Sequence, residues 1–263
     1  MTSPIPRLVG MVHLLALPGS PLYRGSMDEV ITTAAEDAKV LVKAGFPALI
    51  VENFGDVPYH ADRVAPETVA AMTLAVREVI STGVTVGVNI LRNDALSALG
   101  VAAATGARFI RVNVLTGVMY TDQGPITGRA DEIMRKRAAL CPDVEVWADV
   151  MVKHSTPPYG MDAAQATLDT VERGLADAVI VSGSGTGTEP DLEEARAVRA
   201  VLPEGTRLAV GSGASVENLD ALLSAVDTVI VGSSLKFDGD ANKRPDRLRA
   251  EAFVEAAADR GLI

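Results

Sequence analysis

One unit repeats along the whole chain and constrains its fold more than any other feature: a short apolar run, a polar or glycine-rich loop, then a helical pattern. Short runs that are apolar throughout are typical of parallel strands buried on both faces. Strands that alternate with helices in this way predict a parallel α/β fold. Eight runs have the character of such strands: residues 8–12, 48–51, 84–88, 109–112, 144–148, 178–181, 208–210 and 228–231.

The number of units favours a closed barrel over an open sheet. Eight of them follow one another with no long linker, low-complexity tract or shift in composition, and 263 residues suit a barrel of about 250. We therefore expect one domain, residues 1–263, folded as a single (β/α)8 TIM barrel. An open doubly wound sheet is the alternative.

The expected helices begin and end at recognisable residues. Ser26 with Glu29, and Thr188 with Asp191, have the spacing of a capping box, in which a hydroxyl precedes an acid by three residues. Glycines that precede the next strand are expected to end helices in the left-handed conformation. They are Gly45, Gly83, Gly106 and Gly174.

A polar residue stands at the end of each expected strand. In a barrel these ends converge on the C-terminal mouth, where enzymes of this fold keep their chemistry. The simpler interpretation is that Asn, Asp and Ser begin loops and cap turns. The residues are His13, Glu52, Asn89, Asn113, Asp149, Ser182, Ser212 and Ser233.

Glu52 and Asp149 are the strongest catalytic candidates, because a carboxylate that closes an apolar strand is costly without a partner or a task. Two carboxylates at one mouth can divide general-acid and general-base work. Lys153 and His154 follow the fifth strand, and His13 ends the first. Lys153 could hold an anionic substrate, form a Schiff base, pair with Asp149 or be a solvated loop lysine. Which way His154 faces is open.

Three glycine and serine turns follow the last three strands, at residues 183–185, 211–213 and 232–234. Such turns present free backbone N–H groups, and barrels commonly bind phosphate after strands seven and eight. The helix expected after Ser215 would add partial positive charge. The simpler interpretation of each turn is that its glycines are there only because the backbone takes a conformation that other residues disfavour. The expected phosphate ligands are Asn89, Asn113, Ser182, Gly183, Gly185, Gly211, Ser212, Gly213, Gly232, Ser233 and Ser234.

No cofactor is expected. A metal site can be drawn from His13, Glu52, Asp149 and His154, but the sequence has no HxxxH, CxxC or DxDxG spacing to support it. A serine hydrolase is also disfavoured, because residues 182–185 lack the Gly-x-Ser-x-Gly elbow.

Composition limits the partners. A net charge of −10 with five Phe, four Tyr and one Trp argues against a nucleic-acid surface. Cys141 is the only cysteine, which excludes an internal disulfide and suits a reducing compartment. No apolar stretch approaches the roughly 18 residues that span a bilayer, so we expect a cytoplasmic protein, at most peripheral to a membrane. A homo-oligomer remains open.

Four motifs in order resemble the BtpA/SgcQ family over nearly the whole chain. The resemblance implies a ribulose-phosphate-binding-like barrel. The founding member of the family is named for a role in photosystem I biogenesis, so the resemblance also implies that role. Other relatives are encoded next to sugar-uptake genes in organisms without photosynthesis, which implies a more general activity. The first motif reads Leu-Ala-Leu-Pro where the family often has a proline before the leucine, a difference in loop rigidity. The motifs are residues 11–21, 51–58, 149–155 and 179–187, and the positions they carry over are His13, Glu52, Asn53, Asp56, Asp149, Lys153 and His154.

Two classes of function follow. The first is an enzyme that acts by acid–base chemistry on a small phosphorylated sugar or nucleotide-like metabolite, as an isomerase, lyase or glycosyl-transferring enzyme. The second is a non-catalytic assembly factor for membrane complexes, and a metal-dependent hydrolase is a further alternative. A scaffold has no use for strand-end carboxylates beside a phosphate cradle, so we favour the enzyme.

Overall fold

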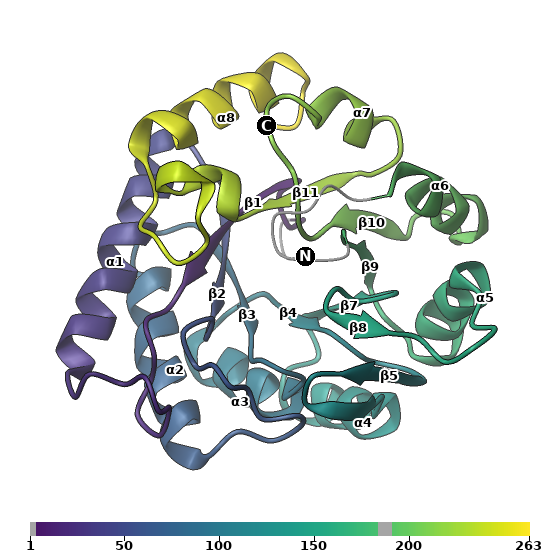
Figure 1. Cartoon of the computed structure of the whole chain (residues 1–263), viewed down its shortest axis with the longest axis horizontal. Coiled ribbons are helices and arrows are strands. Elements are labelled where there is room, and N and C mark those ends of the chain that lie inside the picture. Colours follow the sequence, from purple (N-terminus) through teal and green to yellow (C-terminus); the bar gives the residue numbers. More distant parts are fainter. Residues whose placement is uncertain (1–3, 184–190) are drawn as a thin grey trace.

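Eight parallel strands form a closed barrel in the computed structural model, which describes residues 4–183 and 191–263 (Figure 1). The ring closes because β1 pairs with β11, with Leu8 opposite Val229, and this excludes the open sheet. The barrel prediction is confirmed, with all eight strands near their expected positions. In ring order the strands are β1 (Leu8–His13), β11 (Thr228–Val231), β10 (Arg207–Val210), β9 (Ala178–Val181), β7 (Glu145–Asp149), β4 (Phe109–Val112), β3 (Thr85–Asn89) and β2 (Ala48–Glu52).

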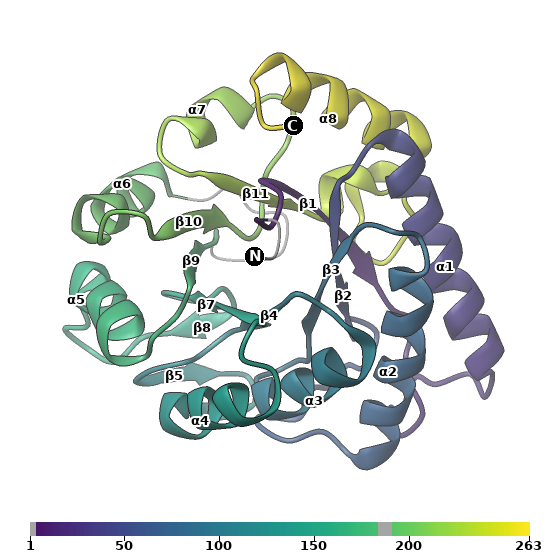
Figure 2. The same ribbon diagram turned by 180° about the vertical axis from the view of Figure 1, so that it is seen from behind.

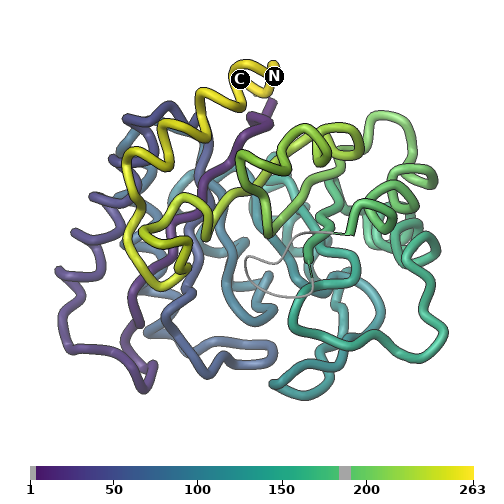
Figure 3. The backbone as a smooth tube through the Cα atoms, turned by 45° about the horizontal axis from the view of Figure 1, so that its top comes forward, coloured from purple at the N-terminus to yellow at the C-terminus, as the bar shows by residue number. Residues whose placement is uncertain are grey.

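Helices surround the barrel on all sides, as the views from the front and from behind show (Figures 1 and 2). The described ends of the chain meet at the barrel's N-terminal side, where Arg7 donates a 3.3 Å hydrogen bond to the carbonyl of Gly261 (Figure 3). The α-helices are α1 (Met27–Ala44), α2 (Pro66–Ile80), α3 (Ala95–Thr105), α4 (Ala130–Leu140), α5 (Ala163–Leu168), α6 (Leu192–Val201), α7 (Leu219–Leu223) and α8 (Arg247–Asp259).

Of the two expected capping boxes, the first is present in its N-cap half. The Ser26 hydroxyl accepts a hydrogen bond from the N–H of Glu29 at 3.1 Å and begins α1. Thr188 lies outside the described residues. The N-cap of α6 is Asp191, whose carboxylate accepts from the first turn of the helix, because a carboxylate satisfies the free N–H groups as a hydroxyl does.

Two of the four glycines end helices as expected. Gly45 and Gly106 cap α1 and α3 in the left-handed conformation, with φ of 112° and 88°. Gly83 is also left-handed but lies two residues beyond Ser81, the C-cap of α2. The expectation for Gly174 is wrong: its φ is −82°, and Leu175 takes the positive φ instead. Gly174 provides space, since a Cβ there would lie 2.6 Å from the carbonyl oxygen of Thr170.

The barrel interior is filled by apolar side chains that alternate along the strands. Phe109 and Trp147 stack at its centre with ring centroids 4.5 Å apart. The neighbouring strand makes room for them with Gly87, where a Cβ would lie 2.4 Å from the Phe109 ring. Bulk on one strand is therefore matched by a missing side chain on the next.

The loops after β4 and β7 form a small antiparallel sheet that the sequence did not predict. It consists of β5 (Val118–Thr121), β6 (Gly124–Thr127) and β8 (Ser155–Thr156). A separate apolar cluster lies beneath it and includes Met119, Ile126 and Val152. Because Val152 is anchored there, the position of the next residue, Lys153, is set by packing.

Two glycine substitutions test the packing of the interior. Gly87→Ala should lower the free energy of unfolding by about 1–3 kcal/mol, because the new methyl group collides with the Phe109 ring. Gly100→Ala in α3 meets nothing within 4 Å and should raise it by about 0.5–1 kcal/mol through helix propensity. Urea unfolding measures both, and equal effects of the two changes would contradict this packing.

Candidate active site

The polar strand ends converge because of strand register. His13, Glu52, Asn89 and Arg111 are successive register partners on β1, β2, β3 and β4. Residues paired in register on parallel strands point to the same side, here toward the axis of the barrel. One layer of polar side chains therefore stands above the apolar interior.

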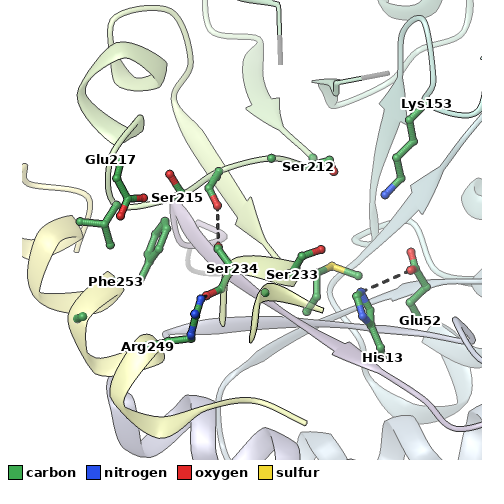
Figure 4. Close-up of a pocket in the computed structure, with 18 of the residues that line it drawn as sticks. His13, Glu52, Lys153, Ser212, Ser215, Glu217, Ser233, Ser234, Arg249 and Phe253 are labelled. Atoms are coloured by element: carbon green, nitrogen blue, oxygen red, sulfur yellow. Dashed lines mark hydrogen bonds and ion pairs between the residues drawn. The ribbon is translucent and has the colours of Figure 1, made fainter. Parts of the chain in front are cut away.

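A cavity of about 560 Å³ opens above this layer (Figure 4). That volume lies within the usual range of about 300–1,000 Å³ for small-molecule sites. Figure 4 shows Lys153 pointing toward His13 and Glu52, with Ser215, Ser234 and Arg249 on the opposite side. The expected site residues that line the cavity are His13, Glu52, Lys153, Gly211, Ser212, Gly213, Gly232, Ser233 and Ser234.

The other expected residues lie elsewhere. His154 is exposed at a positive φ of 55°. Gly185 falls outside the described residues. The rest are buried at the strand ends and are not among the described residues that line the cavity: Asn89, Asn113, Asp149, Ser182 and Gly183.

Asp149 is bound to an arginine that the sequence reasoning missed. Arg111 on β4 donates from Nε and Nη2 to the two Asp149 carboxylate oxygens at 2.9 and 2.7 Å. Asn113 adds a third hydrogen bond at 3.1 Å, and the side chains of the ion pair are 2% and 0% exposed. Gly211 makes room for the guanidinium, because a Cβ there would lie 2.7 Å from Arg111 Nη2.

Lys153 has an unusually low pKa, about 8 rather than 10.5, chiefly because burial penalises the ammonium. Arg111 and Arg92 lower the pKa further, while Glu52 and Asp149 raise it. Pairing with Asp149 is one alternative that the sequence offers, but burial outweighs the carboxylates in setting this pKa. Among the described residues, none forms a hydrogen bond or ion pair with the ammonium group. Arg92 donates to the carbonyl of Lys153 and so fixes the loop that carries it.

His13 is held as a neutral imidazole. Burial lowers its pKa from 6.5 to about 3, and the ammonium of Lys236 contributes next. Nδ1 lies 3.1 Å from the carbonyl oxygen of Ala241. Because a carbonyl only accepts, Nδ1 carries the hydrogen and Nε2 keeps its lone pair. Nε2 faces Glu52 Oε1 at 3.8 Å, and the ring stacks on Phe54 with centroids 4.3 Å apart.

The turn after β10 can accept an anion. Gly213 has a φ of 75°, and no described residue accepts a hydrogen bond from its N–H or from that of Ala214. Asn218 shapes the turn: its Oδ1 accepts from the Ser215 N–H at 2.9 Å, and its Nδ2 donates to the Gly213 carbonyl at 2.8 Å. The expected helix charge is not supplied here, because α7 begins only at Leu219 and has five residues.

Asn53 and Asp56, which belong to the second family motif, hold loops together at the mouth. The Asp56 carboxylate accepts from the Leu17 N–H at 2.7 Å and from Asn53 Nδ2 at 3.0 Å. Asn53 Oδ1 accepts from the Leu91 N–H at 2.7 Å. These bonds join the loops after β1, β2 and β3, which places His13 against Phe54.

The described part of the chain offers neither a cluster of metal ligands nor a membrane-spanning helix. Its residues include no cluster of three or more His, Cys, Asp or Glu side chains with the geometry of a metal site. None of its helices combines the length and apolar character that crossing a bilayer requires.

The fold and the mouth define a (β/α)8 barrel of the class that carries its functional residues on the C-terminal ends of the strands. The chain belongs to the BtpA family, whose sequence model matches residues 6–259.

Similar proteins come from distant organisms. The chain is 47% identical to the photosystem I biogenesis protein BtpA of Synechocystis sp., over 96% of this chain and 88% of that protein. It is 46% identical to the protein TK2179 of Thermococcus kodakarensis, over 96% and 95%. A crystal structure of KGPDC from Streptococcus mutans shares the fold, with a TM-score of 0.58 and 16% identity over 97% of this chain and 99% of that one.

Imidazole NMR tests the state of His13, and the chain has only three histidines. His13 should remain neutral at pH 5 with its hydrogen on Nδ1, and Lys236→Met should raise its pKa. Since the pKa is lower in the folded chain, the unfolded chain takes up this proton first, and stability should fall as the pH drops below about 6.5. A positively charged His13 at pH 5 would contradict the assignment.

Proposed function

We propose that this protein is an enzyme that acts by acid–base chemistry on a small phosphorylated sugar or nucleotide-like metabolite at the C-terminal mouth of its barrel. One observation carries the proposal: His13, Glu52 and Lys153 share a cavity with a turn whose backbone N–H groups lack acceptors among the described residues. Reacting groups and an anion site in one cavity are what such a substrate requires.

The phosphate group binds at the end of the cavity formed by the turns after β10 and β11. Gly213 and Ala214 offer backbone N–H groups, and Arg249 on α8 offers a guanidinium. Guanidinium and N–H groups together recognise phosphate by charge-assisted hydrogen bonds. Glu217 lines the same wall. Ser215 and Arg249 lower the pKa of its carboxyl, so it stays charged and offsets part of the Arg249 charge.

The sugar portion lies between His13 and Lys153. Glu52 exchanges the proton with substrate, and neutral His13, whose Nε2 lies 3.8 Å from Glu52 Oε1, accepts a hydrogen bond from a substrate hydroxyl and orients it. Lys153, with a pKa near 8, is still mostly charged at pH 7 and stabilises negative charge that develops on a substrate oxygen. His154 takes no part in this scheme.

Asp149 acts as a positioning residue in this proposal. Both of its oxygens accept hydrogen bonds from Arg111, so it has no oxygen left to exchange a proton with substrate. Of the two carboxylates expected to divide acid and base work, only Glu52 lines the cavity.

The low pKa of Lys153 also favours a second route, in which the neutral amine attacks a carbonyl substrate and forms an imine. Borohydride separates the two routes, because it reduces only an imine to a stable adduct. With charged Lys153 as the oxyanion stabiliser, borohydride leaves the mass of the protein unchanged, and the rate falls as the pH rises through about 8. A trapped adduct on Lys153 would assign the covalent route.

A role in the assembly of membrane complexes is the second candidate function. The observation that favours it is the 47% identity to a protein named for photosystem I biogenesis. The two candidates differ in what they require of the cavity, because only catalysis needs its titratable groups.

The anion site is tested by two arginines on one helix. Arg249→Ala should weaken binding of ribose 5-phosphate about tenfold, because a charged hydrogen-bond donor is lost. Arg247→Ala is the matched control: that side chain pairs with Glu251 on the surface and should leave the affinity within about twofold. Calorimetric titration measures both, and equal losses would place the phosphate elsewhere.

The reacting groups are tested on the natural substrate. Native mass spectrometry of freshly purified protein should reveal a bound phosphorylated metabolite. Glu52→Gln should reduce its turnover about 100-fold or more while leaving its affinity nearly unchanged. Glu67→Gln, on α2, is the control. Turnover at the wild-type rate by Glu52→Gln would remove Glu52 from the mechanism.

A further inference from the structure

A second cavity, of about 260 Å³, lies on the other side of His13. It is enclosed by the loop after β1, the first half of α1 and residues 241–244. His13 lines both cavities, and its hydrogen bond to Ala241 fixes its ring between them. The imidazole therefore stands at the junction of two binding spaces.

The buried residues that line this second cavity are apolar, with one exception. Leu14, Val30 and Ala241 supply hydrocarbon, and the half-buried Phe54 adds one aromatic ring. An apolar cavity of about 150 Å³ is enough to bind benzene. The volume of about 260 Å³ found here therefore suits a planar group of one or two fused rings.

The exception is Asp37 on α1, which is only 2% exposed. Its Oδ1 accepts a hydrogen bond from Arg244, and no described residue donates to Oδ2. Oδ2 does not belong to the fully buried side-chain atoms that lack a partner, so it is accessible from the cavity. An N–H group on a bound molecule would satisfy it.

The charges around the cavity argue against a second anion. Arg244 is paired with Asp37 and Glu36, and Lys243 is paired with Asp238. Burial raises the pKa of the Asp37 carboxyl, but the buried ammonium of Lys236 also lies close enough to lower it. The two cations, Arg244 and Lys236, thus balance the two carboxylates, Asp37 and Glu36. At the exposed rim Arg24 and Glu29 carry opposite charges. The occupant that fits is therefore uncharged, flat and equipped with an N–H donor.

We infer that the second cavity is a subsite for an uncharged nitrogen heterocycle that the phosphorylated substrate carries on its sugar. This inference rests on the proposed function, because it places the phosphate in the first cavity. The sugar then passes His13, and the heterocycle lies against Phe54 with its N–H directed at Asp37. The substrate class is a nucleotide-like sugar phosphate.

Calorimetric titration with inorganic phosphate, ribose 5-phosphate, adenosine 5′-monophosphate and uridine 5′-monophosphate tests the subsite. At least one nucleotide should bind about tenfold or more tightly than ribose 5-phosphate, as expected when a ring is buried in an apolar cavity. Thr33→Phe places a side chain in the second cavity and should abolish this advantage while leaving ribose 5-phosphate binding within about twofold. Thr32→Phe, at the adjacent exposed position of α1, should change neither.

The outcomes separate the two proposals. Binding of ribose 5-phosphate and both nucleotides with equal affinity overturns the subsite and leaves the proposed function intact. Failure of every phosphorylated probe to bind overturns the proposed function. A nucleotide advantage that survives in folded Thr33→Phe places the ring elsewhere and overturns the subsite. If Thr33→Phe does not fold, Asp37→Asn, which keeps an acceptor for Arg244, replaces it and should reduce the advantage at least threefold.

Discussion

The buried ion pair of Arg111 and Asp149 is the interaction on which the rest of the mouth depends. Removing two charges from water is expensive, and the pair persists because both oxygens of Asp149 are bonded and Asn113 adds a third contact. Deleting one partner of such a pair costs about 3–5 kcal/mol, since it leaves the other charge buried and alone. Gly211 leaves room for the guanidinium, and the parallel pairing of β4 with β7 brings the two side chains together.

This pair also sets the electrostatics of the cavity. Arg111 lowers the pKa of Lys153 and contributes to the low pKa of His13. The ammonium groups of Lys236 and Lys153 lower the pKa of His13 in the same way. A phosphorylated substrate would balance these charges and raise the pKa of Lys153, because an anion favours the charged form. Under the proposed function, substrate binding and the protonation state of Lys153 are thus coupled.

The sequence predicted the barrel well and the site unevenly. The periodic apolar runs placed all eight strands, and strand ends identified His13 and Glu52, because burial and alternation leave a strong local signal. Arg111 was missed because it lies within an apolar strand. Its position among the inward-facing residues of that strand could have indicated a buried charged partner. Lys236 and Arg249 reach the mouth from the last loop and from α8, so only tertiary structure brings them there. The small β5–β6–β8 sheet depends on pairing between distant loops, which no local pattern encodes.

A crystal structure of the protein with ribose 5-phosphate is the most direct test of the central claim, that phosphate and reacting groups share one cavity. The phosphate should lie against the N–H groups of Gly213 and Ala214, near Arg249, with the sugar between His13 and Lys153. An occupied phosphate site elsewhere, with the turns after β10 and β11 empty, would contradict it.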